Sequence, residues 1–135
     1  MTLTFGILIT VIILALLFDF VNGFHDAANA IATVVVSGTL TPGQAVVMAG
    51  LANFVGFFVF GTAVAKMIGK GVVQLDQVTL TLLLATVVGA ILWNIFTWIL
   101  GLPTSSSHAL IGALIGAGVA SAGMGAIIWT GVLKI

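Results

Sequence analysis

The stretch that determines the fold is residues 78–112, which read VTLTLLLATVVGAILWNIFTWILGLPTSSSHALIG. Residues 78–100 carry no charge and are long enough to cross a bilayer, which takes about 20 largely apolar residues. Gly101 and Pro103 end that helix, and the hydroxyl-bearing residues that follow begin another. This second helix, residues 103–121, is short for a span, and no polar loop precedes it. We therefore expect a re-entrant helical hairpin that turns inside the membrane.

The whole sequence has the composition of a membrane protein. Of its 135 residues, 61% are hydrophobic and 4% are charged, whereas about a quarter of the residues of a soluble domain are charged. A net charge of zero without a basic cluster argues against nucleic acid as a partner. The absence of cysteine excludes disulfides and thiolate metal sites. The sequence predicts an all-α, polytopic membrane protein surrounded by lipid.

The N-terminal part of the chain is predicted to form a broken helix. Residues 4–20 are apolar, Asn22 and Gly23 interrupt them, and a helical pattern resumes over residues 27–36. A break at this position would free backbone carbonyl groups inside the membrane, where they must find other partners.

Further segments complete the helical pattern. A second span covers residues 44–65, with Thr41 as its cap and Pro42 at its first helical position. Residues 66–76 hold three of the six charged side chains and are the predicted solvent loop. Residues 124–135 begin an apolar segment that stops before it could cross, so we expect the chain to belong to a larger transporter.

A polar cluster follows the first apolar stretch. An Asp in the middle of a spanning helix costs about 2.5–3.5 kcal/mol on insertion scales, so it needs a functional reason. Carboxylate, amide and carbonyl oxygens bind hard cations such as sodium, and a carboxylate in a dry site can also carry a proton. We predict a coupling-ion site; caps and snorkelling groups at a membrane interface are the alternative. The cluster residues that share one helix face by their 3-4-3 spacing are Asp19, Asn22, Asp26 and Asn29.

A second polar cluster lies at the predicted tip of the hairpin. A helix that begins here directs unpaired N–H groups and its positive dipole end at the cavity, and the hydroxyls add neutral donors. These donors suit a small oxyanion that must be released again. Plain helix capping is the alternative, but discontinuous helices place substrate sites at such positions in secondary transporters. The candidate anion ligands are Thr104, Ser105, Ser106 and Ser107.

Lone polar residues within the spans usually bridge helices, which is the role expected for Asn53 and Thr97. Asn94 lies seven residues before Gly101, on the arm that leads into the hairpin. We therefore assign Asn94 to the coupling-ion site.

Two histidines are candidate proton carriers, with hydrogen-bonded packing as the alternative role. His25 adjoins Asp26, and His108 follows the hydroxyl cluster. Because they come from distant segments, they make a weak ligand set, and we predict no metal site. An intramembrane hydrolase with a nucleophile such as Ser105 is disfavoured, because adjacent Ser and His residues on one helix do not align and no GxSxG motif is present.

At the two clusters the sequence resembles the inorganic phosphate transporter (PiT) family, and most of all its low-affinity bacterial members. The resemblance is carried by NGFHDAANA at residues 22–30 and by LPTSSSHALIG at residues 102–112. It implies two related, oppositely oriented halves that hold phosphate between re-entrant hairpins with cations beside it, commonly in a homodimer. Residues 1–135 form a single transmembrane domain with one half of this pattern. The second half-repeat is expected from the rest of the protein, another subunit or a second copy.

The resemblance also implies roles for individual residues. Asp26 and Asn29 fall on the Asp and the second Asn of the family motif, which serve coupling ions and the phosphate cradle. His25 stands where sodium-coupled relatives often have Asn, which leaves proton coupling or transport of a metal–phosphate complex open. The functional prediction is a symporter of inorganic phosphate in a bacterial plasma membrane, driven by protons or sodium. It is not an enzyme and needs no cofactor. A transporter of sulfate or another tetrahedral oxyanion, and a non-transporting membrane subunit, are the alternatives.

Overall fold

The computed structural model describes residues 2–62 and 71–134. Within these ranges the chain is helical apart from turns, connecting segments and one isolated β-bridge. Three of the described helices are long and apolar enough to cross a membrane, namely α1, α2 and α4. The elements in chain order are α1 (Thr2–Val36), α2 (Pro42–Phe60), η1 (Leu75–Gln77), α4 (Leu80–Ile99), α5 (Ser106–Ala122), η2 (Met124–Ala126) and α6 (Trp129–Val132).

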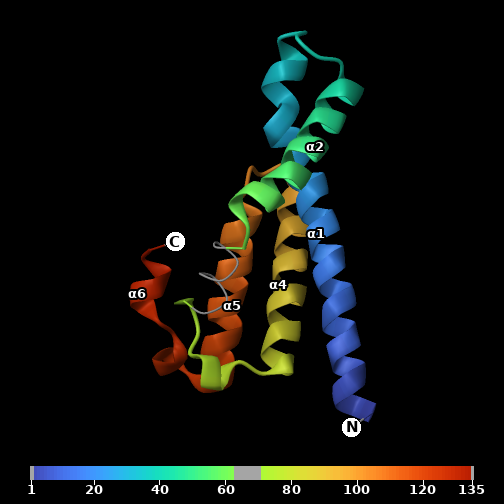
Figure 1. Ribbon diagram of the computed structural model, residues 1–135. Coiled ribbons are helices and arrows are strands. Elements are labelled where there is room, and N and C mark those ends of the chain that lie inside the picture. Colours follow the sequence, from blue (N-terminus) through green and yellow to red (C-terminus); the bar gives the residue numbers. More distant parts are fainter. Residues whose placement is uncertain (1, 63–70, 135) are drawn as a thin grey trace.

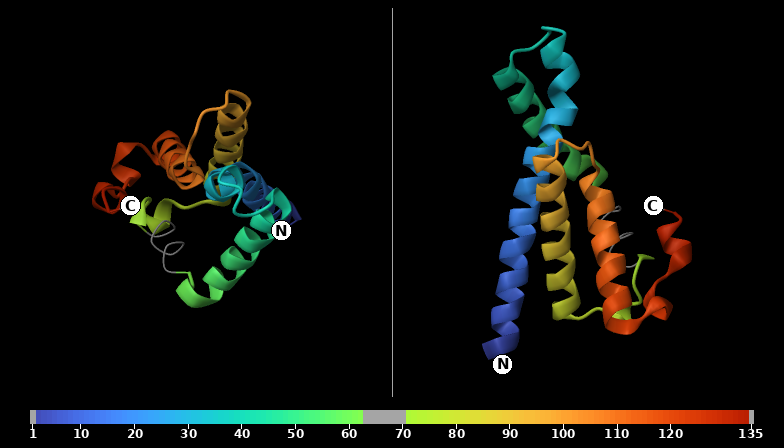
Figure 2. Two further views of the ribbon diagram at one scale, coloured as in Figure 1. Left: turned by 90° about the horizontal axis from the view of Figure 1, so that it is seen from above. Right: turned by 180° about the vertical axis from the view of Figure 1, so that it is seen from behind.

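The helices are arranged around an antiparallel hairpin. The arms predicted for residues 78–100 and 103–121 are α4 and α5, and α4 also packs along α1. The C-terminal end of α1 projects beyond the tip of this hairpin, and α2 runs back from that end (Figure 1). Seen from above, α2 leaves the other helices at an angle (Figure 2). The hairpin tip therefore lies beside the C-terminal half of α1 and not at either of its ends.

Helix α1 is continuous, so the predicted break at Asn22 and Gly23 is wrong. One glycine inside a helix costs only about 1 kcal/mol relative to alanine, whereas a break would leave several backbone groups without partners in an apolar environment. The long apolar segments on both sides favour helix as well. At 1.5 Å per residue, the 35 residues of α1 span about 52 Å. Because this exceeds the hydrocarbon core of a bilayer, α1 must tilt or extend beyond it.

The start of α2 confirms the predicted cap. The Thr41 hydroxyl accepts a hydrogen bond from the Gln44 amide, and the Gln44 side chain accepts one from the Thr41 amide, with Pro42 in the first turn. Together these two hydrogen bonds form a capping box. The helix ends at Gly61, whose positive φ of 61° favours glycine. The predicted continuation through residues 63–65 lies outside the described residues.

The predicted solvent loop over residues 66–76 is only partly right. Residues 66–70, with Lys66 and Lys70, lie outside the described residues. Asp76 is exposed as predicted, but Val72 and Val73 are buried. The charged residues at both ends of this segment favoured a solvent loop, although the apolar residues between them are buried.

Val72 and Val73 belong to a hydrophobic cluster at the base of the hairpin. Val73 forms an antiparallel bridge with Ile127, and the amide of Ile128 donates to the carbonyl of Val72 at 2.9 Å. Leu82, Ile111 and Leu114 complete the cluster from α4 and α5. The segments that flank the hairpin thus pack against its base, and its tip contacts α1.

Gly118 provides the close approach on which this cluster depends. A Cβ atom there would lie 2.9 Å from Ile127 Cδ1 and 3.2 Å from Val73 Cγ2. We expect Gly118→Ala to be less stable by about 1 kcal/mol than the same substitution at an open position of α5, because overpacking forces the neighbours to shift. The matched control is Gly116→Ala on the same helix, where a Cβ meets nothing within 4 Å. Thermal melting in detergent should separate the two variants, and equal melting temperatures would contradict this packing.

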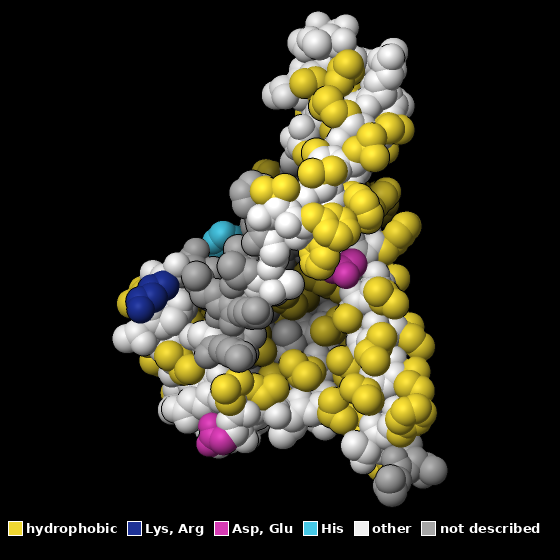
Figure 3. All heavy atoms as spheres, viewed as in Figure 1, with side chains coloured by type: hydrophobic (Ala, Val, Ile, Leu, Met, Phe, Trp, Pro, Cys, Tyr) yellow, Lys and Arg dark blue, Asp and Glu magenta, His cyan; other side chains and the backbone are white. Residues whose placement is uncertain are grey.

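Hydrophobic side chains spread over the outer surfaces of α1 and α2 (Figure 3). Exposed side chains include Leu16 on α1 and Val47, Leu51 and Phe54 on α2. Such a surface is stable only against lipid or other apolar protein.

Candidate functional site

The central contact of the site joins α1 to the first turn of α5. The Ser106 hydroxyl donates to Asp26 Oδ2 at 2.7 Å, across a separation of 80 residues in the chain. Ser106 is only 4% exposed, whereas the Asp26 side chain is 43% exposed. The two polar clusters found in the sequence therefore meet in space, and the carboxylate remains accessible from one side.

His25 lies on the other side of the same carboxylate. Its Nδ1 is 3.5 Å from Asp26 Oδ1, which is an ion pair only when the imidazole is protonated. His25 is buried, and in the part of the chain that the structure describes its Nδ1 has no hydrogen-bond partner. Next to it, Phe24 packs edge to face on Trp98 with ring centroids 5.1 Å apart. The carboxylate is thus held between a buried imidazole and a buried hydroxyl.

A cavity of about 810 Å³ between α1 and α2 reaches Asp26. Asp19, Asn22 and Asp26 line it, as their shared helix face predicted. Asn53 lines it from α2, although the sequence indicated only a helix-bridging role for this residue. Asn29 is exposed and does not line this cavity. Most of the predicted cation ligands therefore share one cavity.

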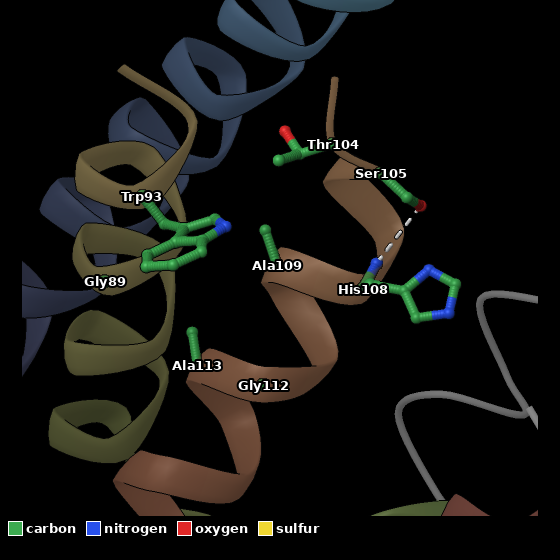
Figure 4. Close-up of a pocket in the computed structure, with 8 residues that line it drawn as sticks. All are labelled: Gly89, Trp93, Thr104, Ser105, His108, Ala109, Gly112 and Ala113. Carbon is green, nitrogen blue, oxygen red and sulfur yellow. Dashed lines mark hydrogen bonds between the residues drawn. The ribbon is translucent and has the colours of Figure 1, made fainter. Parts of the chain in front are cut away.

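The four hydroxyls of the hairpin tip do not share one space. Thr104 and Ser105 line a second cavity, of about 660 Å³, beside Trp93 (Figure 4). Ser106 points to Asp26, and Ser107 is exposed. The rest of the second cavity is formed by Gly89, His108, Ala109, Gly112 and Ala113.

Hydrogen bonds at the tip fix two of these hydroxyls. Ser105 is the N-cap of α5, and its Oγ accepts from the His108 amide at 3.4 Å. The Thr104 hydroxyl lies 3.2 Å from the Thr97 hydroxyl. Thr97 is fully buried and also accepts a hydrogen bond from the Leu102 amide at its carbonyl, 2.9 Å away. Thr97, for which the sequence indicated only helix bridging, therefore anchors the loop that carries the hydroxyls.

Asn94 is fully buried beside α1. Within residues 2–62 and 71–134, neither its Oδ1 nor its Nδ2 has a hydrogen-bond partner, and the same holds for Asn22 Oδ1. Asn94 and His25 line a cavity of about 360 Å³ whose other residues are apolar. The structure thus places Asn94 near His25, not in the cavity with Asp19. Buried polar groups are nearly always hydrogen-bonded, so an unpaired buried amide requires an explanation such as a bound water, an ion or a functional role.

Comparison with known proteins identifies the family, because residues 22–135 match the Phosphate transporter family. The chain belongs to this family. The match begins at Asn22, the first residue of the first motif, and it confirms the resemblance seen in the sequence. This is a family of transporters rather than of enzymes, and the chain is a multi-pass membrane protein.

Individual relatives resemble almost the whole chain. A probable low-affinity inorganic phosphate transporter of Rhizobium meliloti (strain 1021) is 50% identical over 133 residues, covering 98% of this chain and 40% of that protein. The corresponding protein of Bacillus subtilis (strain 168) is 50% identical over 131 residues, covering 94% of this chain and 38% of that protein. A solved structure described as the sodium-dependent phosphate transporter superposes with a TM-score of 0.86 at 31% identity, covering 96% of this chain and 33% of that one. The chain therefore spans between 33% and 40% of the length of these relatives.

Proposed function

We propose that this chain is part of a symporter that carries inorganic phosphate across a bacterial plasma membrane together with a cation. The observation that carries the proposal is the 2.7 Å hydrogen bond between Ser106 and Asp26. It brings the anion-binding end of a helix next to a carboxylate that can hold a cation. The family membership, and relatives named for phosphate and for sodium dependence, support both ligands.

In this proposal the two ligands occupy adjacent positions. The cation binds at Asp26 from the cavity between α1 and α2, with oxygens of Asp19 and Asn22 as further ligands along its route. Asn94 is proposed to join the coupling-ion site from the separate cavity that it shares with His25. Phosphate binds at the first turn of α5, where backbone N–H groups and the helix dipole favour an anion. A cation beside Asp26 also removes the repulsion between the carboxylate and phosphate. The proposed phosphate ligands are Asn29, Thr104, Ser105, Ser106 and Ser107.

The hairpin of α4 and α5 is proposed to be re-entrant. Its tip meets α1 at Asp26, ten residues before the C-terminal end of α1. Ten helical residues measure about 15 Å, which supports a tip that ends inside the membrane. A second half-repeat, from the remaining length seen in the relatives or from a second copy in a homodimer, would complete the site from the other side.

Uptake of radiolabelled inorganic phosphate into vesicles that contain the full-length protein tests this function. We expect an inward sodium gradient or an inward proton gradient to drive accumulation above the level reached without a gradient. Excess unlabelled phosphate should abolish the accumulation of radiolabelled phosphate, and excess sulfate should leave this accumulation unchanged. Competition by sulfate would favour the broader oxyanion specificity, and indifference to both gradients would exclude symport.

The position of His25 supports protons as the second candidate for the coupling ion. A buried imidazole 3.5 Å from Asp26 Oδ1 gives a proton two neighbouring groups to occupy. We expect His25→Asn to lower uptake driven by a proton gradient more than uptake driven by sodium. Equal losses under both gradients would assign His25 a packing role only.

A further inference from the structure

The hydroxyl of Ser106 has one proton, and the structure shows where it points. An ionised carboxylate can only accept hydrogen bonds, so in the 2.7 Å contact with Asp26 Oδ2 the donor is Ser106. With its proton directed at the carboxylate, Ser106 has none to offer to a phosphate oxygen. A residue predicted as a phosphate ligand is therefore unavailable as a donor while this bond lasts.

Counting protons in the same way shows that a second hydroxyl, that of Thr104, cannot donate to phosphate either. Thr97 Oγ1 lies 2.9 Å from the carbonyl of Trp93 and 3.1 Å from that of Asn94, so its single proton is used within α4. In its 3.2 Å contact with Thr104, Thr97 must then accept, and the Thr104 proton is used as well. Ser105 Oγ only accepts, from the His108 amide. In this arrangement Ser105 and Ser107 are the tip hydroxyls whose protons remain free within the described part of the chain.

We propose that Ser106 is a switchable donor that makes phosphate binding depend on the cation; this rests on the function proposed above. A cation that binds Asp26 takes over the lone pairs that now accept from Ser106, and the Ser106 oxygen can join its ligands. A hydroxyl that coordinates a cation through oxygen directs its proton away from it. The freed proton then points to phosphate. The proton stays on Ser106 throughout, and the direction of the O–H bond changes.

The exposure of Asp26 and the burial of Ser106 fit a sequence in which the cation binds before phosphate. The Asp26 side chain is 43% exposed and faces the cavity of about 810 Å³, so a cation can reach it without moving the hairpin. Ser106 is 4% exposed, so the carboxylate of Asp26 is its hydrogen-bond acceptor in this state. Phosphate reaches the hydroxyl only after cation binding has opened this contact.

Equilibrium binding of inorganic phosphate to the purified full-length protein, without sodium and with saturating sodium, tests the switch. In the wild-type protein we expect sodium to lower the Kd for phosphate about tenfold, within the usual range for two coupled sites. In Ser106→Ala this ratio should be smaller than in the wild type, because the contribution of the hydroxyl is lost while the charge of the cation beside Asp26 still favours phosphate. Ser105→Ala is the matched control, because its proton is free in both states. It should raise the Kd with and without sodium and keep the wild-type ratio.

Two outcomes overturn the switch. One is a Ser106→Ala protein that binds phosphate more weakly by the same factor in both buffers, which would make Ser106 an ordinary ligand. The other is a wild-type Kd that sodium does not change. If Ser106→Ala does not fold, Ser106→Cys, whose thiol is a weak donor, must show a reduced ratio as well. A wild-type protein that binds no phosphate in either buffer would instead refute the proposed function.

Discussion

Replacing Asp26 with Asn is expected to lower cation-driven phosphate uptake about a hundredfold, at the upper end of the coupling between two binding sites. The change keeps the size of the side chain and an acceptor oxygen for the Ser106 hydroxyl, so the contact between α1 and α5 survives. What is lost is the negative charge that holds the cation. Uptake into vesicles under a sodium or proton gradient measures the effect, with protein levels in the membrane matched to wild type.

The control for this variant is Asp76→Asn. Asp76 lies in η1, is exposed, and receives a hydrogen bond from the neighbouring Gln77 side chain, at 3.0 Å. We expect its uptake to stay within about twofold of wild type, because exposed polar contacts contribute little. Uptake by Asp19→Asn should lie between that of Asp26→Asn and that of Asp76→Asn. Asp19 lines the cavity but lies about 10 Å along α1 from Asp26. Wild-type uptake by Asp26→Asn would refute the cation site.

The sequence predicted the features of this fold that depend on local chemistry. The cap formed by Thr41 and Pro42 could be read from residue types at fixed spacing. The 3-4-3 spacing placed Asp19, Asn22 and Asp26 in one cavity because α1 is a helix. Even the predicted break at Gly23 failed for a local reason, since one glycine is too weak a signal against two long apolar flanks.

Features that depend on distant contacts could not be predicted in the same way. Nothing in the pattern shows that Val73 pairs with Ile127 in a bridge at the base of the hairpin. Nor does a run of three serines show that Ser106, rather than Ser105, turns toward Asp26. That choice depends on how α5 is placed relative to α1, and α4 packs against both of these helices.

The second large effect concerns Asn94, where stability and activity are expected to change in opposite directions. Both amide atoms of Asn94 are buried without a partner in the described residues, and each such group costs about 1–3 kcal/mol. Leucine has a similar shape and no polar atoms. We therefore expect Asn94→Leu to stabilise the protein by about 1–3 kcal/mol, measured by thermal melting, and to lower coupled uptake at least about tenfold.

Thr97→Val is the matched control, because Thr97 is equally buried on the same helix, one turn away. Its hydroxyl is paired with the Trp93 carbonyl and with Thr104, so its removal should destabilise the protein by about 1 kcal/mol. The two substitutions should thus move the melting temperature in opposite directions. If Asn94→Leu lowers it as well, the amide has a partner in the complete protein, and Asn94 contributes to packing there.

A gain in stability together with a loss of uptake would have a direct physical meaning. A protein keeps an unpaired buried amide against its cost when another state of the working cycle uses that amide. For Asn94 that state is the one with a cation bound, because its carbonyl oxygen is a suitable ligand and it shares a cavity with His25, next to Asp26. Sodium should then raise the melting temperature of the wild-type protein, since a ligand that binds only the folded state stabilises it. In Asn94→Leu this rise should be smaller, which links the buried amide to cation binding and not to folding alone.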